Sequence, residues 1–265
     1  MAADPRSVLT RTGPAPDLVL RYGTGDDHLV DVHLPPGPPT PRPVVVLLHG
    51  GFWRREFDRT HTRPLAHALR AAGYVVASPE YTRSSRGRPG RPGTFDDVTA
   101  VRLRLPTLLA ETAPGRADAA PVTVLGHSAG GHLALWWALT APPELAPARV
   151  VALAPVADLA RAYAEDLDDG AVRDLLGGGP REHPDRYATA DVAPMLPGYA
   201  GPADLQVLHG DRDDRVPVAH SRSLAGVRLH ELPGAGHFAP IDPLSPAWPY
   251  VRVAVQGGAR PCDPD

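Results

Sequence analysis

The sequence predicts an α/β fold in which a mostly parallel central sheet is covered by helices on both faces. Apolar runs rich in β-branched residues alternate with helical patterns over most of the 265 residues, as in chains where helices connect parallel strands. Residues 44–48 (VVVLL) are an unbroken apolar run, which is typical of a strand buried on both faces. The length suits one large domain with a substantial core.

The individual elements follow from the apolar patterns and from the residues that end them. Residues 18–34 predict two antiparallel strands joined near residues 23–27 at an edge of the sheet. A long helix is expected over residues 96–111, interrupted or bent at Pro106. Shorter helices are expected at 62–72 and 248–256, and further strands at 44–48, 74–78, 122–125, 150–153, 207–208 and 227–232.

Residues 156–204 break this alternation, because they combine two short helical patterns with several proline and glycine stops. We predict a small cap-like insertion over the strand ends, where a substrate would bind, since long structureless segments are uncommon inside compact domains. A long crossover connection is the alternative. The α/β domain is then expected to span residues 18–256, between an N-terminal tail (1–17) and a C-terminal tail (257–265).

Composition narrows the class of protein. A net charge of −3 gives no reason to expect a nucleic acid or an anionic membrane as a partner. No stretch approaches the roughly 18 apolar residues of a membrane span, and the N-terminus lacks the pattern of a secretory signal, so a cytoplasmic protein is expected. The single cysteine, Cys262, excludes an internal disulfide. No histidines have the H-E-x-x-H spacing, so no metal site is expected.

The motif GHSAG, residues 126–130, joins a predicted strand directly to a predicted helix. Gly126 and Gly130 have no Cβ, so the strand and the helix can approach closely around a tight turn. In such a turn Ser128 is held in a strained backbone conformation with its hydroxyl exposed above the sheet, as in a nucleophile elbow. An ordinary loop is the alternative in a chain with 26 glycines, but the flanking elements favour the elbow.

A serine nucleophile needs a base within hydrogen-bond reach, and the base needs an acid to orient it. His237 is the candidate base, because it follows a predicted strand in the glycine-flanked loop GAGHF. The acid is expected in HGDRDDRVP after the preceding strand, where Asp211, Asp213 and Asp214 are all candidates. Serine, aspartate and histidine then occur in the chain order known from α/β-hydrolases.

Backbone amides are expected to stabilise the negatively charged oxygen of the reaction intermediate. The motif HGGFW, residues 49–53, ends an apolar strand in consecutive glycines, which leaves the amides of Gly51 and Phe52 free to point into one site. The amide of Ala129, at the start of the helix after the nucleophile, is the other expected donor. A plain β-turn after the strand is the alternative.

Together, HGGFW, GHSAGGH, HGDRDDRVP and GAGHF resemble the α/β-hydrolase superfamily over residues 18–255. Within it, the sequence is similar to kynurenine formamidases and to feruloyl and acetyl-xylan esterases. This resemblance implies an α/β-hydrolase fold, acyl-enzyme chemistry without a cofactor, and Asp213 as the acid. One departure is that many relatives have Tyr-Arg where this chain has Tyr81-Thr82-Arg83, so a structural role for that arginine is in doubt.

The expected substrate is a small-molecule ester or amide. Trp53, Tyr81 and Phe238 could line a pocket for an aromatic group, which suits an aryl formamide such as N-formylkynurenine, or they could belong to the core. A general carboxylesterase is the broader hypothesis, and a non-catalytic binding protein on the same fold is a further one. The sequence leaves the oligomeric state and the acyl and leaving groups open.

Overall fold

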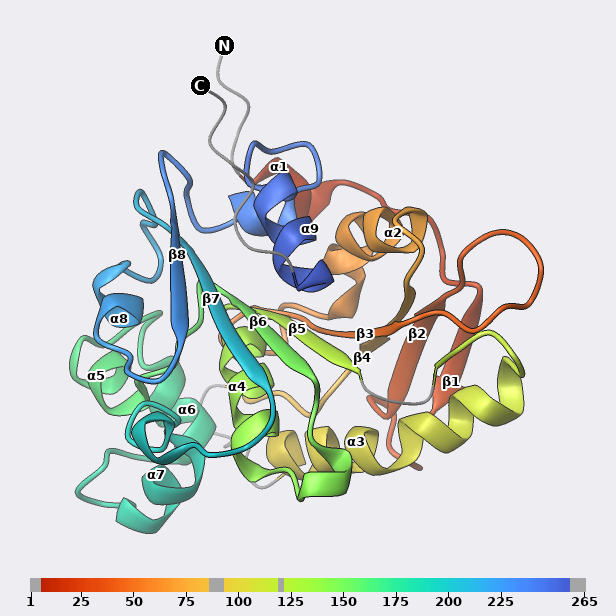
Figure 1. Ribbon diagram of the computed structural model, residues 1–265. Coiled ribbons are helices and arrows are strands. Elements are labelled where there is room, and N and C mark those ends of the chain that lie inside the picture. The colour runs from red at the N-terminus through yellow and green to blue at the C-terminus, as the bar shows by residue number, and fades with distance from the viewer. Residues whose placement is uncertain (1–5, 86–92, 119–121, 258–265) are drawn as a thin grey trace.

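In the described residues of the computed structural model, 6–85, 93–118 and 122–257, eight strands form one sheet (Figure 1). Their order across the sheet is β1-β2-β4-β3-β5-β6-β7-β8. The strands are β1 (Leu18–Arg21), β2 (Leu29–His33), β3 (Val44–Leu48), β4 (Val75–Pro79), β5 (Thr123–His127), β6 (Arg149–Leu153), β7 (Asp204–Gly210) and β8 (Arg228–Leu232).

The sheet is mostly parallel, as predicted. Strands β1 and β2 pair antiparallel with each other, and β2 pairs antiparallel with β4. All the remaining neighbours are parallel. The carboxyl ends of β3, β5, β7 and β8 therefore lie at one edge of the sheet, and this edge receives each of the motifs singled out in the sequence.

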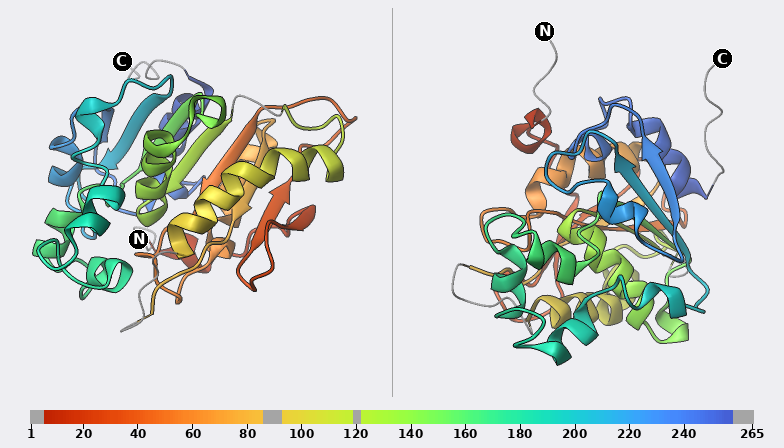
Figure 2. Two further views of the ribbon diagram at one scale, coloured as in Figure 1. Left: turned by 90° about the horizontal axis from the view of Figure 1, so that it is seen from below. Right: turned by 90° about the vertical axis from the view of Figure 1, so that its left-hand side faces the viewer.

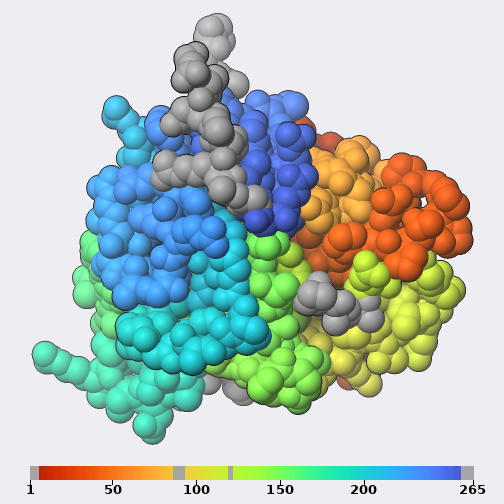
Figure 3. Space-filling view, in the orientation of Figure 1, coloured from red at the N-terminus to blue at the C-terminus, as the bar shows by residue number. Residues whose placement is uncertain are grey.

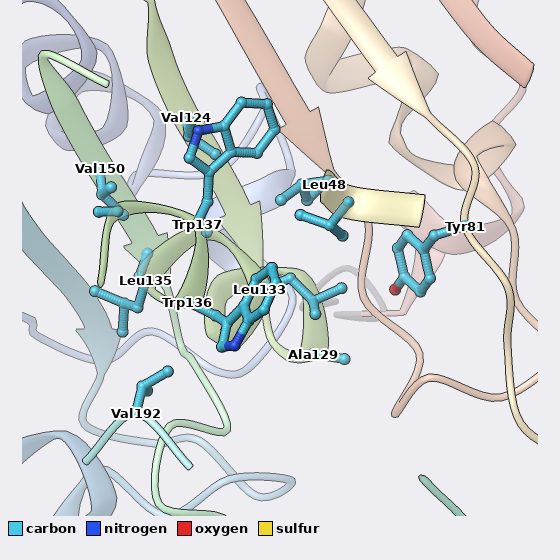
Figure 4. Packing of buried hydrophobic residues seen from close by; sticks show 14 of the residues in the cluster. Leu48, Tyr81, Val124, Ala129, Leu133, Leu135, Trp136, Trp137, Val150 and Val192 are labelled. Atoms are coloured by element: carbon cyan, nitrogen blue, oxygen red, sulfur yellow. The ribbon is translucent and has the colours of Figure 1, made fainter. Parts of the chain in front are cut away.

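Helices cover both faces of the sheet (Figures 1 and 2). Along β3, Val44, Val46 and Leu48 pack with the helices of one face, whereas Val45 and Leu47 pack with those of the other. Figure 4 shows the first of these two cores, in which side chains of α4 lie against β5 and β6. The first face carries α3 (Gly93–Thr112) and α4 (Ala129–Thr140), and the second carries α1 (Ser7–Thr10), α2 (Arg63–Ala71) and α9 (Trp248–Gln256).

The segment from 156 to 204 contains short helices and appears in Figure 3 as a green-to-teal bulge at the lower left. Its elements are α5 (Leu159–Ala164), α6 (Ala171–Leu176), α7 (Pro184–Ala190) and the 3₁₀ helix η3 (Leu196–Gly198). Short elements elsewhere are η1 (Arg59–Thr62), η2 (Pro143–Leu145), α8 (Ala219–Arg222) and η4 (Ala239–Ile241).

Two elements differ from the expectation. Helix α3 begins at Gly93 and continues through Pro106 without interruption, because its apolar stripe, which includes Val98 and Leu105, is buried against the sheet. Strand β7 begins at Asp204, earlier than its apolar residues indicate, since it pairs with β6 and β8 on both sides.

The segments expected as tails are described only in part. Within residues 1–17, α1 places Val8, which is fully buried, against the core of the second face. Residues 1–5 and 258–265, including Cys262, lie outside the described residues. The boundaries of the domain stay a prediction.

Candidate active site

Ser128 lies at the turn between β5 and α4, in a backbone conformation that non-glycine residues rarely adopt. Its φ of 55° and ψ of −115° are the strained geometry of a sharp strand-to-helix turn. A Cβ on Gly126 would lie 2.0 Å from the carbonyl oxygen of Gly130, and a Cβ on Gly130 would lie 2.2 Å from that of Leu48. Both glycines are therefore required for the close approach of the helix to the strands.

The hydroxyl of Ser128 is not exposed, contrary to the expectation from the sequence. The residue is 1% exposed, because bulky side chains surround the turn. Its Oγ has no hydrogen-bond partner among the described residues. A pocket of about 360 Å³, including the open space at its mouth, lies beside it, lined by Leu9, Gly51, Phe52, Phe57, His61, His127, Ser128, Arg215, His237 and Phe238.

His237 lines the same pocket and is oriented by Asp213. Its Nδ1 lies 2.7 Å from Oδ2 of Asp213, and because a carboxylate can only accept, Nδ1 carries the proton. The other ring nitrogen, Nε2, is therefore the basic one in the neutral ring. His127, next to Ser128 in the turn, also holds the backbone of His237 in place, because its Nε2 lies 3.0 Å from the carbonyl oxygen of His237.

The Asp213 carboxyl is fully buried and accepts hydrogen bonds on both oxygens. Its Oδ1 accepts from the amides of Arg215 and Val216, each at 2.8 Å. Its Oδ2 also accepts from Nε2 of His209 at 3.1 Å. Burial alone would raise the pKa of Asp213, but the hydrogen bonds from His209 and His237 outweigh burial and hold this pKa well below its ordinary value.

The other two aspartates of the motif have different surroundings. Asp211 accepts a hydrogen bond from the amide of Gly234 at 2.7 Å, and Asp214 is exposed. Of the three candidates, only Asp213 has a described contact with His237.

The loop after β3 has an unusual backbone over three consecutive residues. Gly51, Phe52 and Trp53 have φ angles of 110°, 49° and 56°. Within the described chain, the amides of Gly51, Phe52 and Ala129 donate no hydrogen bond to protein atoms. Gly51 and Phe52 line the pocket beside Ser128, and Ala129 begins α4. Free amides at this position can bind an anionic oxygen.

A buried hydrogen bond between His49 and Glu80 supports this loop. His49 Nε2 lies 2.7 Å from Glu80 Oε1, and the imidazole stacks on the ring of Tyr81 with the centroids 4.3 Å apart. The Tyr81 hydroxyl donates to the backbone carbonyl of His49 at 2.9 Å. Burial would raise the pKa of Glu80, but the charges of His49 and Arg83 and hydrogen bonds from His49 and from the Arg59 amide lower it to about 2.

Arg83, whose role was in doubt from the sequence, belongs to this buried network. Its Nε lies 3.3 Å from Glu80 Oε1, and its Nη2 lies 3.0 Å from Asp27 Oδ1. The extra residue in Tyr81-Thr82-Arg83 therefore still places the guanidinium beside the carboxylate under the loop.

The family of the chain can be read at this point. The family model BD-FAE matches residues 30–227, which is most of the chain, and this range includes Ser128, Asp213 and the loop after β3. The chain belongs to the BD-FAE family of α/β-hydrolase esterases.

Relatives of this BD-FAE protein include proteins named as an esterase and as a kynurenine formamidase. It is 29% identical to Esterase LipQ of Mycobacterium tuberculosis over 245 residues, which is 82% of this chain and 56% of LipQ. It is 28% identical to the kynurenine formamidase of Salmo salar over 120 residues, which is 44% of this chain and 36% of that protein. The chain thus spans little more than half of the length of LipQ.

Solved structures have the same fold. Esterase B of Lactobacillus rhamnosis superposes with a TM-score of 0.72 at 21% sequence identity, covering 96% of this chain and 88% of that one. This similarity establishes that the BD-FAE protein has an α/β-hydrolase fold.

Of the aromatic residues proposed for substrate binding, the structure places one in the pocket of the BD-FAE protein. Phe238 lines the pocket. Trp53 and Tyr81 do not, because both are buried in the core, as Figure 4 shows for Tyr81. Trp53 instead packs edge-to-face on His132 with the ring centroids 5.4 Å apart.

Four lining residues were not singled out from the sequence. Arg215 follows Asp213 by two residues. This closeness to the expected acid was the one feature of the sequence that could have indicated its place in the pocket. Leu9, Phe57 and His61 reach the pocket from α1 and from the segment before α2, where no local pattern marks them. Burial lowers the pKa of His61 to about 4, so its imidazole is neutral near pH 7.

Neither a cluster of metal-binding side chains nor a membrane-spanning helix occurs in the described residues. No group of three or more histidine, cysteine, aspartate or glutamate side chains there is arranged to hold a metal ion. No helix in the same part of the chain is long and apolar enough to cross a membrane.

Proposed function

We propose that this BD-FAE protein is a serine hydrolase that cleaves small carboxylic esters through an acyl-enzyme intermediate. The observation that carries the proposal is the hydrogen bond between His237 and Asp213, which orients a basic ring nitrogen in the pocket that also contains Ser128. The order of these residues and the strained turn at Ser128 support the same roles.

In the proposed reaction, Oγ of Ser128 attacks the ester carbonyl carbon while Nε2 of His237 takes its proton. The carbonyl oxygen becomes negatively charged and accepts hydrogen bonds from the amides of the loop after β3 and of Ala129. The bond to the leaving alcohol then breaks, and the alcohol receives the proton from His237. A water molecule releases the acid from Ser128 by the same two steps.

Asp213 has two roles in this proposal. Its hydrogen bond keeps the proton of neutral His237 on Nδ1, and its negative charge stabilises the imidazolium that forms when Nε2 takes the proton. The lowered pKa of Asp213 supports a carboxylate that stays ionised throughout the pH range in which such an enzyme works.

The pocket favours a small substrate with an apolar group. It is narrow, about 360 Å³ even when the open space at its mouth is included, and three phenylalanines lie in its lining. Arg215 lies with its guanidinium carbon 5.9 Å from the centre of the Phe52 ring, so a polar or anionic substituent is tolerated on that side. The cytoplasmic location and the absence of a nucleic-acid or membrane partner remain predictions.

An aryl formamidase is the second candidate. The relative in Salmo salar that is named kynurenine formamidase and the aromatic side chains of the pocket favour it. The same three residues would carry out the reaction, with an arylamine in place of the alcohol as the leaving group.

Steady-state turnover of p-nitrophenyl acetate and of N-formylkynurenine distinguishes the two candidates. The proposal predicts that kcat/KM for the ester exceeds that for the formamide by at least tenfold. The reverse order would make the protein a formamidase, and turnover of neither compound or of any short-chain aryl ester would contradict a hydrolytic function.

A further inference from the structure

A second cavity lies between α3 and α4 on the first face of the sheet, and it shares no lining residue with the pocket beside Ser128. Its volume is about 870 Å³ including its open mouth, and most of its lining is apolar. The walls include Val46 of β3, Leu105 and Leu109 of α3, Trp137 of α4 and Leu145 of η2.

A buried arginine lines this cavity without a carboxylate partner. Arg102 is 8% exposed, and its described hydrogen bonds go to two neutral acceptors, the carbonyl oxygen of Trp137 and Oγ1 of Thr140, both at 3.3 Å. Its Nε is buried and has no hydrogen-bond partner among the described residues. Burying a guanidinium without an anionic partner costs folding free energy. An ordinary surface arginine carries no such cost.

Trp137 supplies a second unsatisfied donor in the same lining. The residue is 2% exposed, and its Nε1 has no hydrogen-bond partner in the described part of the chain. Figure 4 shows its indole on the side of α4 that faces β5, next to Val124. Two buried donors from neighbouring helices thus lie at one apolar cavity, and neither has a strong acceptor among the described residues.

The one acidic residue in the described lining does not satisfy Arg102. Glu144 lies in η2, is exposed, and makes no ion pair with Arg102 within the described residues. The burial of Arg102 lowers its pKa, as expected for a guanidinium that lacks a nearby negative charge.

We propose that this cavity binds the carboxylate of a medium-chain fatty acid, with the head group at Arg102 and Trp137 and the chain along the apolar wall. A guanidinium forms two parallel hydrogen bonds with a planar carboxylate. Because Arg102 is one positive charge and the Trp137 indole is a neutral donor, the pair suits an anion with a single negative charge better than a phosphate. The apolar residues of α3, α4 and β3 suit an unbranched hydrocarbon chain.

Isothermal titration calorimetry with sodium decanoate tests this site, with decan-1-ol as the uncharged comparison. The wild-type protein is expected to bind one decanoate at least tenfold more tightly than the alcohol. Arg102→Gln should weaken decanoate binding at least tenfold, and Ala146→Leu, which fills the cavity, should weaken it similarly. Thermal unfolding without ligand checks the fold of both variants, and Arg102→Gln should be no less stable, because it removes an unpaired buried charge.

Phe57→Ala is the matched control, because Phe57 lines only the pocket beside Ser128. Its decanoate affinity should equal that of the wild type. The proposal is overturned if decanoate does not bind, if the alcohol binds equally well, or if Phe57→Ala weakens binding while Arg102→Gln and Ala146→Leu do not. These outcomes are independent of ester turnover.

Discussion

Asp213 is the most strongly constrained of the proposed catalytic residues, because four groups donate hydrogen bonds to its buried carboxylate. The two backbone amides on Oδ1 fix the plane of the carboxylate, which leaves Oδ2 for His237 and His209. His209 Nε2 also lies 2.8 Å from the carbonyl oxygen of Val216. Since both partners of this nitrogen are acceptors, His209 is held as the Nε2–H tautomer and supports the negative charge on Asp213.

Asp213→Asn is expected to lower kcat on p-nitrophenyl acetate by about 10⁴-fold while the protein stays folded. An asparagine can present its amide group to Nδ1 of His237, which favours the wrong tautomer of the ring. Asp214→Asn is the matched control, because this neighbouring side chain is exposed, and it should keep nearly full activity. If Asp214→Asn were the more damaging change, the assignment of the acid would be wrong.

Glu80 makes the stability of the protein depend on pH in the acid range. Its pKa is lowered to about 2 in the folded state, so it contributes stability above its unfolded pKa of about 4.3, and this contribution is lost as the pH falls towards 2. Glu80→Gln should therefore reduce the free energy of unfolding by up to about 3 kcal/mol at pH 7, and the difference from the wild type should shrink below pH 4.

Chemical denaturation at a series of pH values between 2 and 7 measures this effect. Glu111→Gln, which changes an exposed carboxyl group of α3, should follow the wild-type curve. Parallel curves for the wild type and Glu80→Gln across the whole range would contradict the assigned role of Glu80.

The histidines near the motifs show how far residue type alone could be interpreted. His49, His127, His132 and His209 each have a ring nitrogen within hydrogen-bond distance of a backbone carbonyl oxygen. The partners of His127 and His132 could not be predicted, because these two carbonyls are distant in the chain and meet the ring only in the fold.

At the scale of elements, the junction of β5 and α4 depends on the absence of side chains at two positions. Added to Gly126, a Cβ would meet backbone atoms of α4, which cannot move away as the end of a side chain could. The junction also holds the strained conformation of Ser128. Packing of the strand and helix therefore stabilises the backbone geometry that the proposed chemistry requires.

Gly126→Ala should destabilise the protein by about 2 kcal/mol or more, because the added methyl group forces the strand and the helix apart. Turnover of p-nitrophenyl acetate should also fall, since Ser128 would shift relative to His237. Gly198→Ala is the control, because a Cβ there has no atom within 4 Å. Thermal unfolding of both variants measures the difference, and equal melting temperatures would contradict this account of the turn.

The elements that the sequence predicted best are those with continuous apolar runs, such as β3 and the strands next to it in the sheet. Strand β7 was underestimated because Asp204 and Gln206 interrupt its apolar pattern, although parallel neighbours on both sides supply its hydrogen bonds. Helix α3 was expected to be interrupted or bent at Pro106, but it continues through this residue, where burial of its apolar stripe maintains the helix. In both cases tertiary contacts outweigh the local signal.

At the scale of the whole molecule, the buried Arg54 and the half-buried Arg215 connect the 156–204 insertion to the proposed active site. Arg54, directly after the loop at Gly51–Trp53, bonds to Oδ2 of Asp168 at 2.9 Å and to Asp174 at 2.9 Å. Arg215 bonds to Oδ1 of the same Asp168 at 2.7 Å. Asp168 and Asp169 have φ angles above 50°, so these contacts hold the insertion in a strained turn.

Asp168→Asn should therefore affect both stability and catalysis. We expect a loss of about 1–3 kcal/mol of stability, because two arginines lose their shared negative charge, and a decrease of about tenfold in kcat/KM as the loop after β3 and Arg215 become less constrained. Asp185→Asn, at an exposed position of α7 in the same insertion, is the control. An Asp168→Asn variant with wild-type kcat/KM would show that the insertion does not position the site.

This connection could not be predicted from the sequence, because Arg54, Asp168 and Arg215 lie far apart in the chain, and only Arg215 belongs to one of the motifs singled out. The motifs did predict the residues at the carboxyl ends of the strands, since a parallel sheet brings those ends together. Trp53 and Tyr81 mark the limit of that reasoning, because Trp53 belongs to HGGFW and yet both rings are buried in the core.

The central claim is that Ser128 is the nucleophile, and the most direct test is covalent labelling with a fluorophosphonate followed by intact-protein mass spectrometry. We predict that the wild-type protein gains one label, that peptide mapping places it on Ser128, and that Ser128→Ala gains none while unfolding at an unchanged temperature. A wild-type protein that stays unlabelled, or a Ser128→Ala variant that is labelled as rapidly as the wild type, would contradict the claim.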